Sequence, residues 1–131
     1  MYILDTNTLI YYFKGMGNVA NKLLQYPPRD IAIPSIVLYE LEVGLAKSTE
    51  PEKRRQQLET LTGLIAILPL GAKEAQSAGI IRAVLEKAGT PIGPMDTLIA
   101  GTALANQGTL VTHNTKEFSR VDELRIIDWY M

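Results

Sequence analysis

Short apolar runs alternate with longer segments of helical spacing along this chain. The runs, which we predict to be strands, lie at 2–4, 31–33, 64–68, 110–112 and 125–127. Apolar spacing, first-turn prolines and stop residues predict helices at 7–12, 18–25, 36–46, 51–61, 72–87, 94–105 and 115–121. Short apolar strands that alternate with helices are typical of a parallel sheet covered on both faces. We therefore predict an α/β fold, with a helical hairpin arm at 36–61.

Length and composition indicate one folded domain. The chain has 131 residues, which suits a single core and is too short for two ordinary domains. Hydrophobic residues make up 47% and charged residues 21%, and this apolar content excludes disorder as the main state. The chain contains 13 Lys and Arg residues and 14 Asp and Glu residues, so the formal net charge is -1. A non-specific binder of polyanions is therefore excluded.

The lack of cysteine and the single histidine limit the kinds of catalytic and metal site that this chain can form. There are no cysteines and one histidine, which excludes disulfides, thiolate nucleophiles and Cys/His zinc clusters. A Ser-His-Asp scheme would have to use His113, which we expect to be a solvated loop residue. No signal peptide and no apolar run near the roughly 20 residues of a membrane span is visible, so we expect a cytoplasmic protein. The carboxylates of Asp and Glu therefore remain as the candidate groups for catalysis or metal binding.

Asp5 is the first candidate among them. It directly follows the first apolar run, and in open α/β sheets ligands bind at the carboxyl ends of strands. The alternative is that Asp5 caps the following helix, a common task for aspartate. Because Thr6, Asn7 and Thr8 could also cap that helix, capping by Asp5 would be redundant, and we favour a chemical role.

Two glutamates lie on the predicted helix 36–46. Glu40 shares a face with Ile36, whereas Glu42 lies nearer Leu45. Acids on a mainly apolar helix need a partner or a metal if they are buried, and otherwise face solvent. The spacing by itself does not choose between the two residues.

Two further acids belong to the first turns of helices. Asp96 follows Pro94 and precedes an apolar, small-residue segment, 97–105, whose burial would bring this acid to the edge of the core. Glu117 lies behind the fourth strand together with Asn114. For both acids the alternative role is stabilisation of the helix N-terminus.

Four sequence blocks resemble the motifs of PIN-domain ribonucleases, and more closely those of the VapC-type toxins of toxin–antitoxin pairs. The blocks are LDTN, YELEVGL, TPIGPMDTLIAGTALA and VTHNTKEF, in that order, and the likeness extends to the terminal RIIDWY. The resemblance implies a single PIN-like domain over 1–131. It also implies a three-layer fold with a short parallel sheet of four to five strands flanked by helices.

The resemblance further implies an acidic site with polar support, made of Asp5, Glu40, Asp96 and Glu117 with Thr6 and Asn114. It selects Glu40 over Glu42, because Glu40 occupies the acid position of the family's E-L-x-x-G pattern. Some relatives carry an aspartate where this chain has Asn114, so Glu117 is expected to ligate weakly or through water.

Clustered carboxylates repel one another, and a bound cation or protonation relieves the repulsion. Oxygen ligands select hard ions, so we expect Mg²⁺, with Mn²⁺ as a substitute. Asp5 and Asp96 are the expected metal ligands, Glu40 would position water or metal, and Glu117 would complete the shell. A second ion, recruited by phosphate, would clamp the attacking and leaving oxygens.

The resemblance implies an endoribonuclease that hydrolyses phosphodiester bonds of structured RNA such as tRNA. It also implies a homodimer and a VapB-like antitoxin whose C-terminal segment crosses the cleft; no membrane is involved. Contacts to RNA phosphates could come from scattered basic residues, whose alternative role is an ordinary solvated surface: Lys14, Lys47, Lys53, Arg54, Arg55, Arg82, Lys87, Lys116 and Arg120.

Two other functions compete with this hypothesis. The segment 5–9 is similar to the D-x-D-x-T loop of haloacid-dehalogenase-like phosphatases, but Asn7 stands where that chemistry needs a second aspartate. A PIN-fold module that binds RNA or a partner without cutting is the second alternative, against which the presence of all four acids argues.

Overall fold

Five parallel strands form the central sheet of the protein, whose computed structural model describes residues 1–131. The strands are β1 (Tyr2–Leu4), β2 (Ile31–Pro34), β3 (Ala66–Leu68), β4 (Thr109–Val111) and β5 (Arg125–Ile127). Their order in the sheet is β3-β2-β1-β4-β5. Ile3 of β1 pairs with Ala32 on one side and with Leu110 on the other. The predicted α/β class and the parallel sheet of four to five strands are confirmed.

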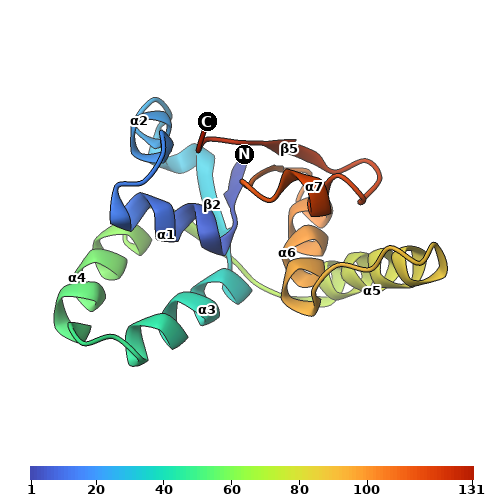
Figure 1. The fold of residues 1–131 in the computed structure, drawn as a ribbon, viewed down its shortest axis with the longest axis horizontal. Helices are drawn as coiled ribbons and strands as arrows, with labels where there is room; N and C mark the ends of the chain where they lie inside the picture. The colour runs from blue at the N-terminus through green and yellow to red at the C-terminus, as the bar shows by residue number, and fades with distance from the viewer.

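Seven α-helices and a short 3₁₀ helix surround this sheet. They are α1 (Thr6–Lys14), α2 (Val19–Leu23), η1 (Pro28–Asp30), α3 (Ser35–Ala46), α4 (Pro51–Thr62), α5 (Ala72–Lys87), α6 (Pro94–Ala105) and α7 (Thr115–Phe118). Each predicted helix is present. In Figure 1, the arm of α3 and α4 lies on one side of β1 and β2, and the α5–α6 pair lies on the other.

Several predicted boundaries were wrong. The third strand begins at Ala66 instead of residue 64, because pairing with β2 starts where Ala32 meets Ala66. The last helix ends at Phe118 instead of residue 121, and the fourth strand ends at Val111 instead of residue 112. The helix predicted at 18–25 is shorter at both ends, and η1 was not predicted. Local sequence pattern does not encode the extent of cross-strand pairing, which decides such ends.

Side chains in the middle of the sheet are fully inaccessible to solvent. Ile3, Leu4, Leu110 and Val111 on β1 and β4 are fully buried. Complete burial of one such side chain contributes about 1.5–3 kcal/mol. The small-residue helix α6 is buried as predicted, with Ile99, Ala100 and Ala103 inaccessible to solvent. None of the helices has the length and apolar character needed to cross a membrane.

The strand order creates a switch point beside β1. The chain passes from β1 to β2 on one side of the sheet, and later enters β4 on the other side of β1. The loops that follow β1 and β4 therefore separate, and they leave a crevice at the carboxyl ends of the strands, where open α/β sheets bind ligands. Asp5 follows β1, and Thr112 follows β4 at this place.

Candidate active site

Asp5 is buried at the end of β1, with only 4% of its surface exposed. It is also the N-cap of α1, because its Oδ1 accepts a hydrogen bond from the Thr8 backbone N–H at 2.9 Å. The expectation that Asn7 or Thr8 caps this helix was wrong, and so was the view that capping by Asp5 is redundant. The cap occupies Oδ1 and fixes the direction of the carboxylate.

The surroundings of Asp5 disfavour its charge. Burial raises the pKa of Asp5, the Thr112 hydroxyl and the Thr8 N–H lower it by hydrogen bonding, and the net shift is upward. Thr112 in turn accepts a hydrogen bond from the Asn114 N–H at 3.0 Å. Thr112 was not among the residues predicted from sequence for the site, although a threonine at the end of a buried strand was a usable signal.

The structure separates the two glutamates of α3. The Thr6 hydroxyl donates to Glu40 Oε1 over 2.5 Å, which joins the start of α1 to the middle of α3. Glu42 instead forms a bidentate pair with Arg55 of α4, at 2.6 and 3.0 Å, on the exposed side of the helical arm. Glu40 therefore faces the β1 loop, whereas Glu42 stabilises the arm.

Asp96 lies in the first turn of α6 and is partly buried. Burial, followed by the negative charges of Asp5, Glu117 and Glu40, raises the pKa of Asp96 to about 6. A helix N-terminus ordinarily favours an anion, so the opposing terms outweigh the macrodipole here. The charges of three other candidate acids act on this one carboxyl, which places the four side chains in one neighbourhood.

Glu117 is held by the residue that precedes α7. The Asn114 side-chain amide donates to Glu117 Oε2 at 3.1 Å. Thr6 and Asn114, expected as polar support, thus contact Glu40 and Glu117 respectively. Neutral donors orient both glutamates without cancelling their charge.

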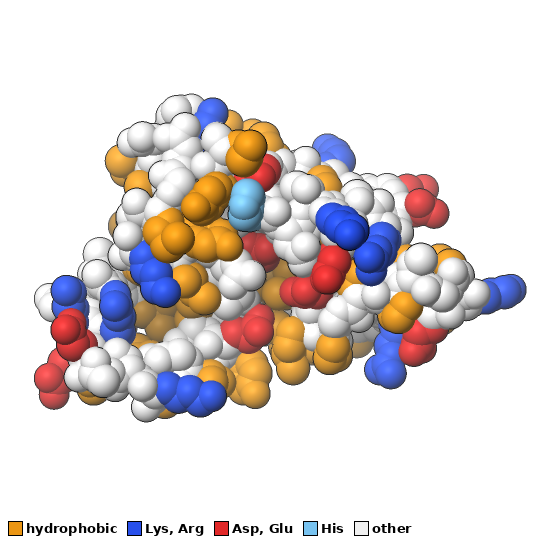
Figure 2. All heavy atoms as spheres, viewed as in Figure 1, with side chains coloured by type: hydrophobic (Ala, Val, Ile, Leu, Met, Phe, Trp, Pro, Cys, Tyr) orange, Lys and Arg blue, Asp and Glu red, His pale blue; other side chains and the backbone are white.

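The four acids make an open cluster of uncompensated charge. No lysine, arginine or histidine forms an ion pair with any of them. No three acidic or histidine side chains of the protein stand close enough to hold a metal ion by themselves. Oxygen donors in an open arrangement fit a hard divalent ion that keeps several of its waters. On the face seen in Figure 2, acidic side chains cross the middle of the molecule below the pale-blue histidine.

Comparisons with known proteins agree with this geometry. The PIN domain family matches residues 2–124. The chain is 37% identical over 128 residues to the tRNA(fMet)-specific endonuclease VapC of Shigella flexneri, covering 98% of this chain and 97% of that one. It is 39% identical over 131 residues to ribonuclease VapC2 of Rickettsia felis, with 98% of each chain covered. The chain is a VapC-type member of the PIN-domain family.

Solved structures of VapC proteins share the fold. A chain in the crystal structure of VapBC2 from Rickettsia felis, bound to a fragment of promoter DNA, superposes with a TM-score of 0.90 at 38% identity and 98% coverage of both chains. The PIN-like fold implied by the sequence blocks is therefore confirmed. Membership of this family also removes the haloacid-dehalogenase-like phosphatase from consideration.

Most of the basic residues singled out in the sequence have local partners. Arg55 pairs with Glu42, Lys53 with Glu50, and Arg82 with Glu86. Arg54 donates to Gln57, and Arg120 to the Pro91 carbonyl. Lys14, Lys47, Lys87 and Lys116 form no ion pair within the protein. Lys14 lines the same groove as Glu40, and Lys116 directly precedes Glu117, so these two are the better candidates for contacts with phosphate.

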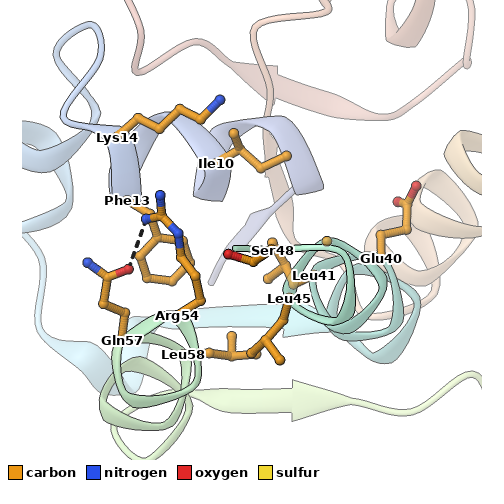
Figure 3. Close-up of a pocket in the computed structure, with 11 residues that line it drawn as sticks. Ile10, Phe13, Lys14, Glu40, Leu41, Leu45, Ser48, Arg54, Gln57 and Leu58 are labelled. Carbon is orange, nitrogen blue, oxygen red and sulfur yellow. Dashed lines mark hydrogen bonds between the residues drawn. The ribbon is translucent and has the colours of Figure 1, made fainter. Parts of the chain in front are cut away.

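A groove adjoins the acidic cluster of this VapC-type protein. Its volume is about 320 Å³, and it lies between α1, α3 and α4. Five of its 11 lining residues are hydrophobic, namely Ile10, Phe13, Leu41, Leu45 and Leu58, and the others are Gly44 and the polar residues Lys14, Glu40, Ser48, Arg54 and Gln57. Figure 3 shows Glu40 at one end of this groove, with its carboxylate directed away from the apolar lining. Of the four candidate acids, Glu40 is the one that lines the groove.

The raised pKa of Asp96 predicts an unusual pH dependence of stability. Above pH 6 the folded protein carries an Asp96 charge that the unfolded chain tolerates better, so metal-free protein gains stability as the pH falls from 7 to 5. We expect about 1 kcal/mol, discounted because the side chain is partly exposed. Denaturant unfolding in EDTA at both pH values measures it. Asp96→Asn should reduce the gain to what the raised pKa of Asp5 contributes, and Asp122→Asn on the exposed surface should retain it in full. A wild-type protein less stable at pH 5 than at pH 7 would contradict the prediction.

Proposed function

We propose that this protein is a metal-dependent endoribonuclease toxin that cleaves tRNA and that a cognate VapB-like antitoxin neutralises. The observation that carries the proposal is the four-carboxylate cluster at the switch point, in which three acids raise the pKa of the fourth. The name of the Shigella flexneri relative, a tRNA(fMet)-specific endonuclease, supports initiator tRNA as the substrate. The proposal treats 1–131 as one catalytic domain.

Asp5 and Asp96 would hold Mg²⁺, or Mn²⁺ in its place. Burial and neighbouring carboxylates disfavour the charged form of both side chains and raise the pKa of each. A bound cation would favour the charged form and lower both pKa values. A divalent ion at these oxygens supplies a Lewis acid for the phosphate and an acidified water for the attack on phosphorus.

The remaining residues position groups around that centre. Glu40 keeps Oε2 free, because the Thr6 hydroxyl engages only Oε1, so Glu40 can accept a proton or a hydrogen bond from water. Glu117 likewise has Oε1 free, while Asn114 holds Oε2. Asp5 cannot turn, because the Thr8 N–H fixes its Oδ1. Acceptors that are already oriented in this way would position an attacking water with little further loss of freedom.

The test is cleavage of purified initiator tRNA, with elongator methionine tRNA as the matched control. The tRNA is end-labelled and incubated with Mg²⁺, with Mn²⁺ or with EDTA. We expect discrete fragments of initiator tRNA with either metal and none in EDTA. Intact tRNA under all conditions, together with retained RNA binding, would instead identify the non-cutting PIN-fold module.

The groove between α1, α3 and α4 offers the antitoxin a place to bind. Five apolar side chains lie in its lining together with Lys14 and Arg54, and Glu40 lies at one end, so an amphipathic segment bound in the groove would end beside this acid. A lysine or arginine at that end would meet uncompensated carboxylates. Occupation of the groove would therefore block the site without any change in the fold.

A single substitution should separate inhibition from catalysis. Gly44 lines the groove, and a Cβ added there meets nothing within 4 Å. Gly44→Trp should fill the groove from a permissive helix position and weaken inhibition by the antitoxin about tenfold or more, with RNA cleavage unchanged. Gly79→Trp on α5, where a Cβ also meets nothing, is the matched control. Unaltered inhibition of the Gly44 variant in a titrated cleavage assay would place the antitoxin elsewhere.

We also propose the homodimer that the sequence resemblance implies. Large apolar side chains remain exposed at four-residue spacing on two helices. They are Tyr39 and Val43 on α3, and Ile80 and Val84 on α5. Such pairs suit an interface more than an isolated surface.

A further inference from the structure

A column of stacked groups stands beside the acidic cluster. The imidazole of His113 stacks on the ring of Tyr130, with centroids 4.2 Å apart and planes 24° from parallel. Gly17 lies against the same tyrosine ring, since a Cβ at Gly17 would come within 2.6 Å of Tyr130 Cδ2. Tyr11 contacts Tyr130 edge to face, with centroids 4.8 Å apart. Tyr130 is thereby fixed, and His113 is the outermost ring of the column.

The orientation of His113 is held from the side. Its Nδ1 lies 2.8 Å from Asp128 Oδ2, and the other oxygen of Asp128 accepts the Tyr130 N–H at 2.8 Å. This carboxylate therefore ties the imidazole and the tyrosine backbone together. Nε2 of His113 has no partner within the protein, and 37% of the side chain is exposed. Tyr11 and Tyr130 are the only rings near it, and Tyr11 meets it edge on at 5.9 Å.

The column belongs to the same loop as two site residues. His113 stands between Thr112, which contacts Asp5, and Asn114, which contacts Glu117. The lone histidine is visible next to acidic side chains in Figure 2. A group stacked on the imidazole would therefore lie next to the acidic cluster.

The charge of this site makes stacking valuable. Four carboxylates without cationic partners repel phosphates, and the whole chain has a net charge of -1. A nucleobase is neutral and brings a flat face, and unpaired RNA bases are commonly bound by stacking on aromatic rings, including histidine. Stacking thus adds affinity where ionic contacts are few.

We propose that the exposed face of His113 stacks on an unpaired base of the RNA next to the scissile phosphodiester, with Tyr130 and Asp128 as its rigid support. This inference rests on the proposed ribonuclease function. It makes His113 a binding residue that positions the RNA, while the carboxylates do the chemistry. The alternative is that the column only clamps the C-terminus, where the Asn18 N–H already binds the Tyr130 carbonyl at 2.9 Å.

The test compares His113→Ala, which removes the ring, with His113→Phe, which keeps a flat ring at the same position. The first measurement is the affinity for a labelled, single-stranded oligoribonucleotide of mixed sequence, with Asp96→Asn present so that no cleavage occurs. The second is kcat and KM for initiator tRNA in the otherwise unmodified protein. We expect His113→Ala to raise Kd and KM about tenfold, the usual effect of losing one stacked base, with kcat within about threefold of wild type. His113→Phe should stay within about threefold throughout.

Melting temperatures of both variants separate the two roles of the column. A His113→Ala variant that melts earlier but binds the oligoribonucleotide like the wild type would overturn the inference, and so would a wild type with no measurable affinity. If tRNA is cleaved and His113→Ala does not change KM, the ribonuclease function is supported and the base contact is contradicted. If RNA binding depends on His113 but no RNA is cleaved, the base contact is supported and the proposed ribonuclease function is contradicted.

Discussion

Asp96→Asn is expected to slow RNA cleavage by about 10³-fold without unfolding the protein, because the proposed metal site would lose a ligand and with it several kcal/mol of charge stabilisation at phosphorus. Its ionised form is disfavoured by burial and by three neighbouring acids, which raise its pKa to about 6. Removing the charge relieves that repulsion, so the melting temperature of metal-free protein at pH 7.5 should hold or rise. Activity and stability should therefore change in opposite directions.

Asp5→Asn should behave similarly for a different reason. Asparagine can still accept the Thr8 N–H and cap α1, so the fold should persist while a proposed metal ligand is lost. On α3, Glu40→Gln and Glu42→Gln form a matched pair two residues apart. Cleavage should fall only in the Glu40 variant, because Glu42 pairs with Arg55 on the exposed side of the arm. Cleavage at the wild-type rate by both aspartate variants would end the proposal of a carboxylate site.

Gly101→Ala is expected to destabilise the fold by about 3 kcal/mol, at the upper end of the cost of overpacking. A Cβ on Gly101 would lie 2.6 Å from both the Cβ and the backbone N of Ala78, so α6 would have to move away from α5. The backbone of a helix cannot yield as the end of a flexible side chain can. Because α6 also carries Asp96, the displacement should weaken metal-dependent activity as well.

Gly44→Ala is the matched control for Gly101→Ala. Both glycines are inside helices, but a Cβ on Gly44 meets nothing within 4 Å. Replacing a glycine by alanine in a helix interior then stabilises by about 0.5–1 kcal/mol. Urea unfolding of both variants should give shifts of opposite sign. A Gly101 variant as stable as the wild type would show that α5 and α6 can separate at little cost.

Burial alone does not identify a functional acid in this protein. Glu74 at the start of α5 is only 2% exposed, yet it accepts hydrogen bonds from the Gly71 N–H at 3.0 Å and the Asn106 amide at 3.1 Å. Burial acts to raise the pKa of Glu74, but these hydrogen bonds outweigh it and the pKa is lowered. Asp96 has like charges around it instead of donors. This difference in partners, and not burial, separates Glu74 from Asp96.

Asp5, Asp96 and Glu117 could be named from sequence because each follows a strand or lies in the first turn of a helix, whereas Glu40 was selected over Glu42 only by the family blocks. The sequence pattern could not show that Asp5 both caps α1 and faces the site. The two roles had been treated as alternatives, whereas a carboxylate has two oxygens and can serve both. Thr112 was missed for a related reason. Its hydroxyl matters only once β4 lies beside β1, which a local pattern does not state.

Local patterns were enough to predict the elements of this protein, their parallel arrangement and the faces that form the core. The hydrophobic period of each element is a local property of runs of three to sixteen residues such as β1 and α5. Which polar groups meet follows from the packing of the folded chain, as when Thr6 reaches Glu40 across 34 residues or His113 reaches Asp128 across 15. Such contacts depend on how helices and strands pack, because a hydrogen bond needs both atoms within about 3 Å, a tolerance finer than any sequence period.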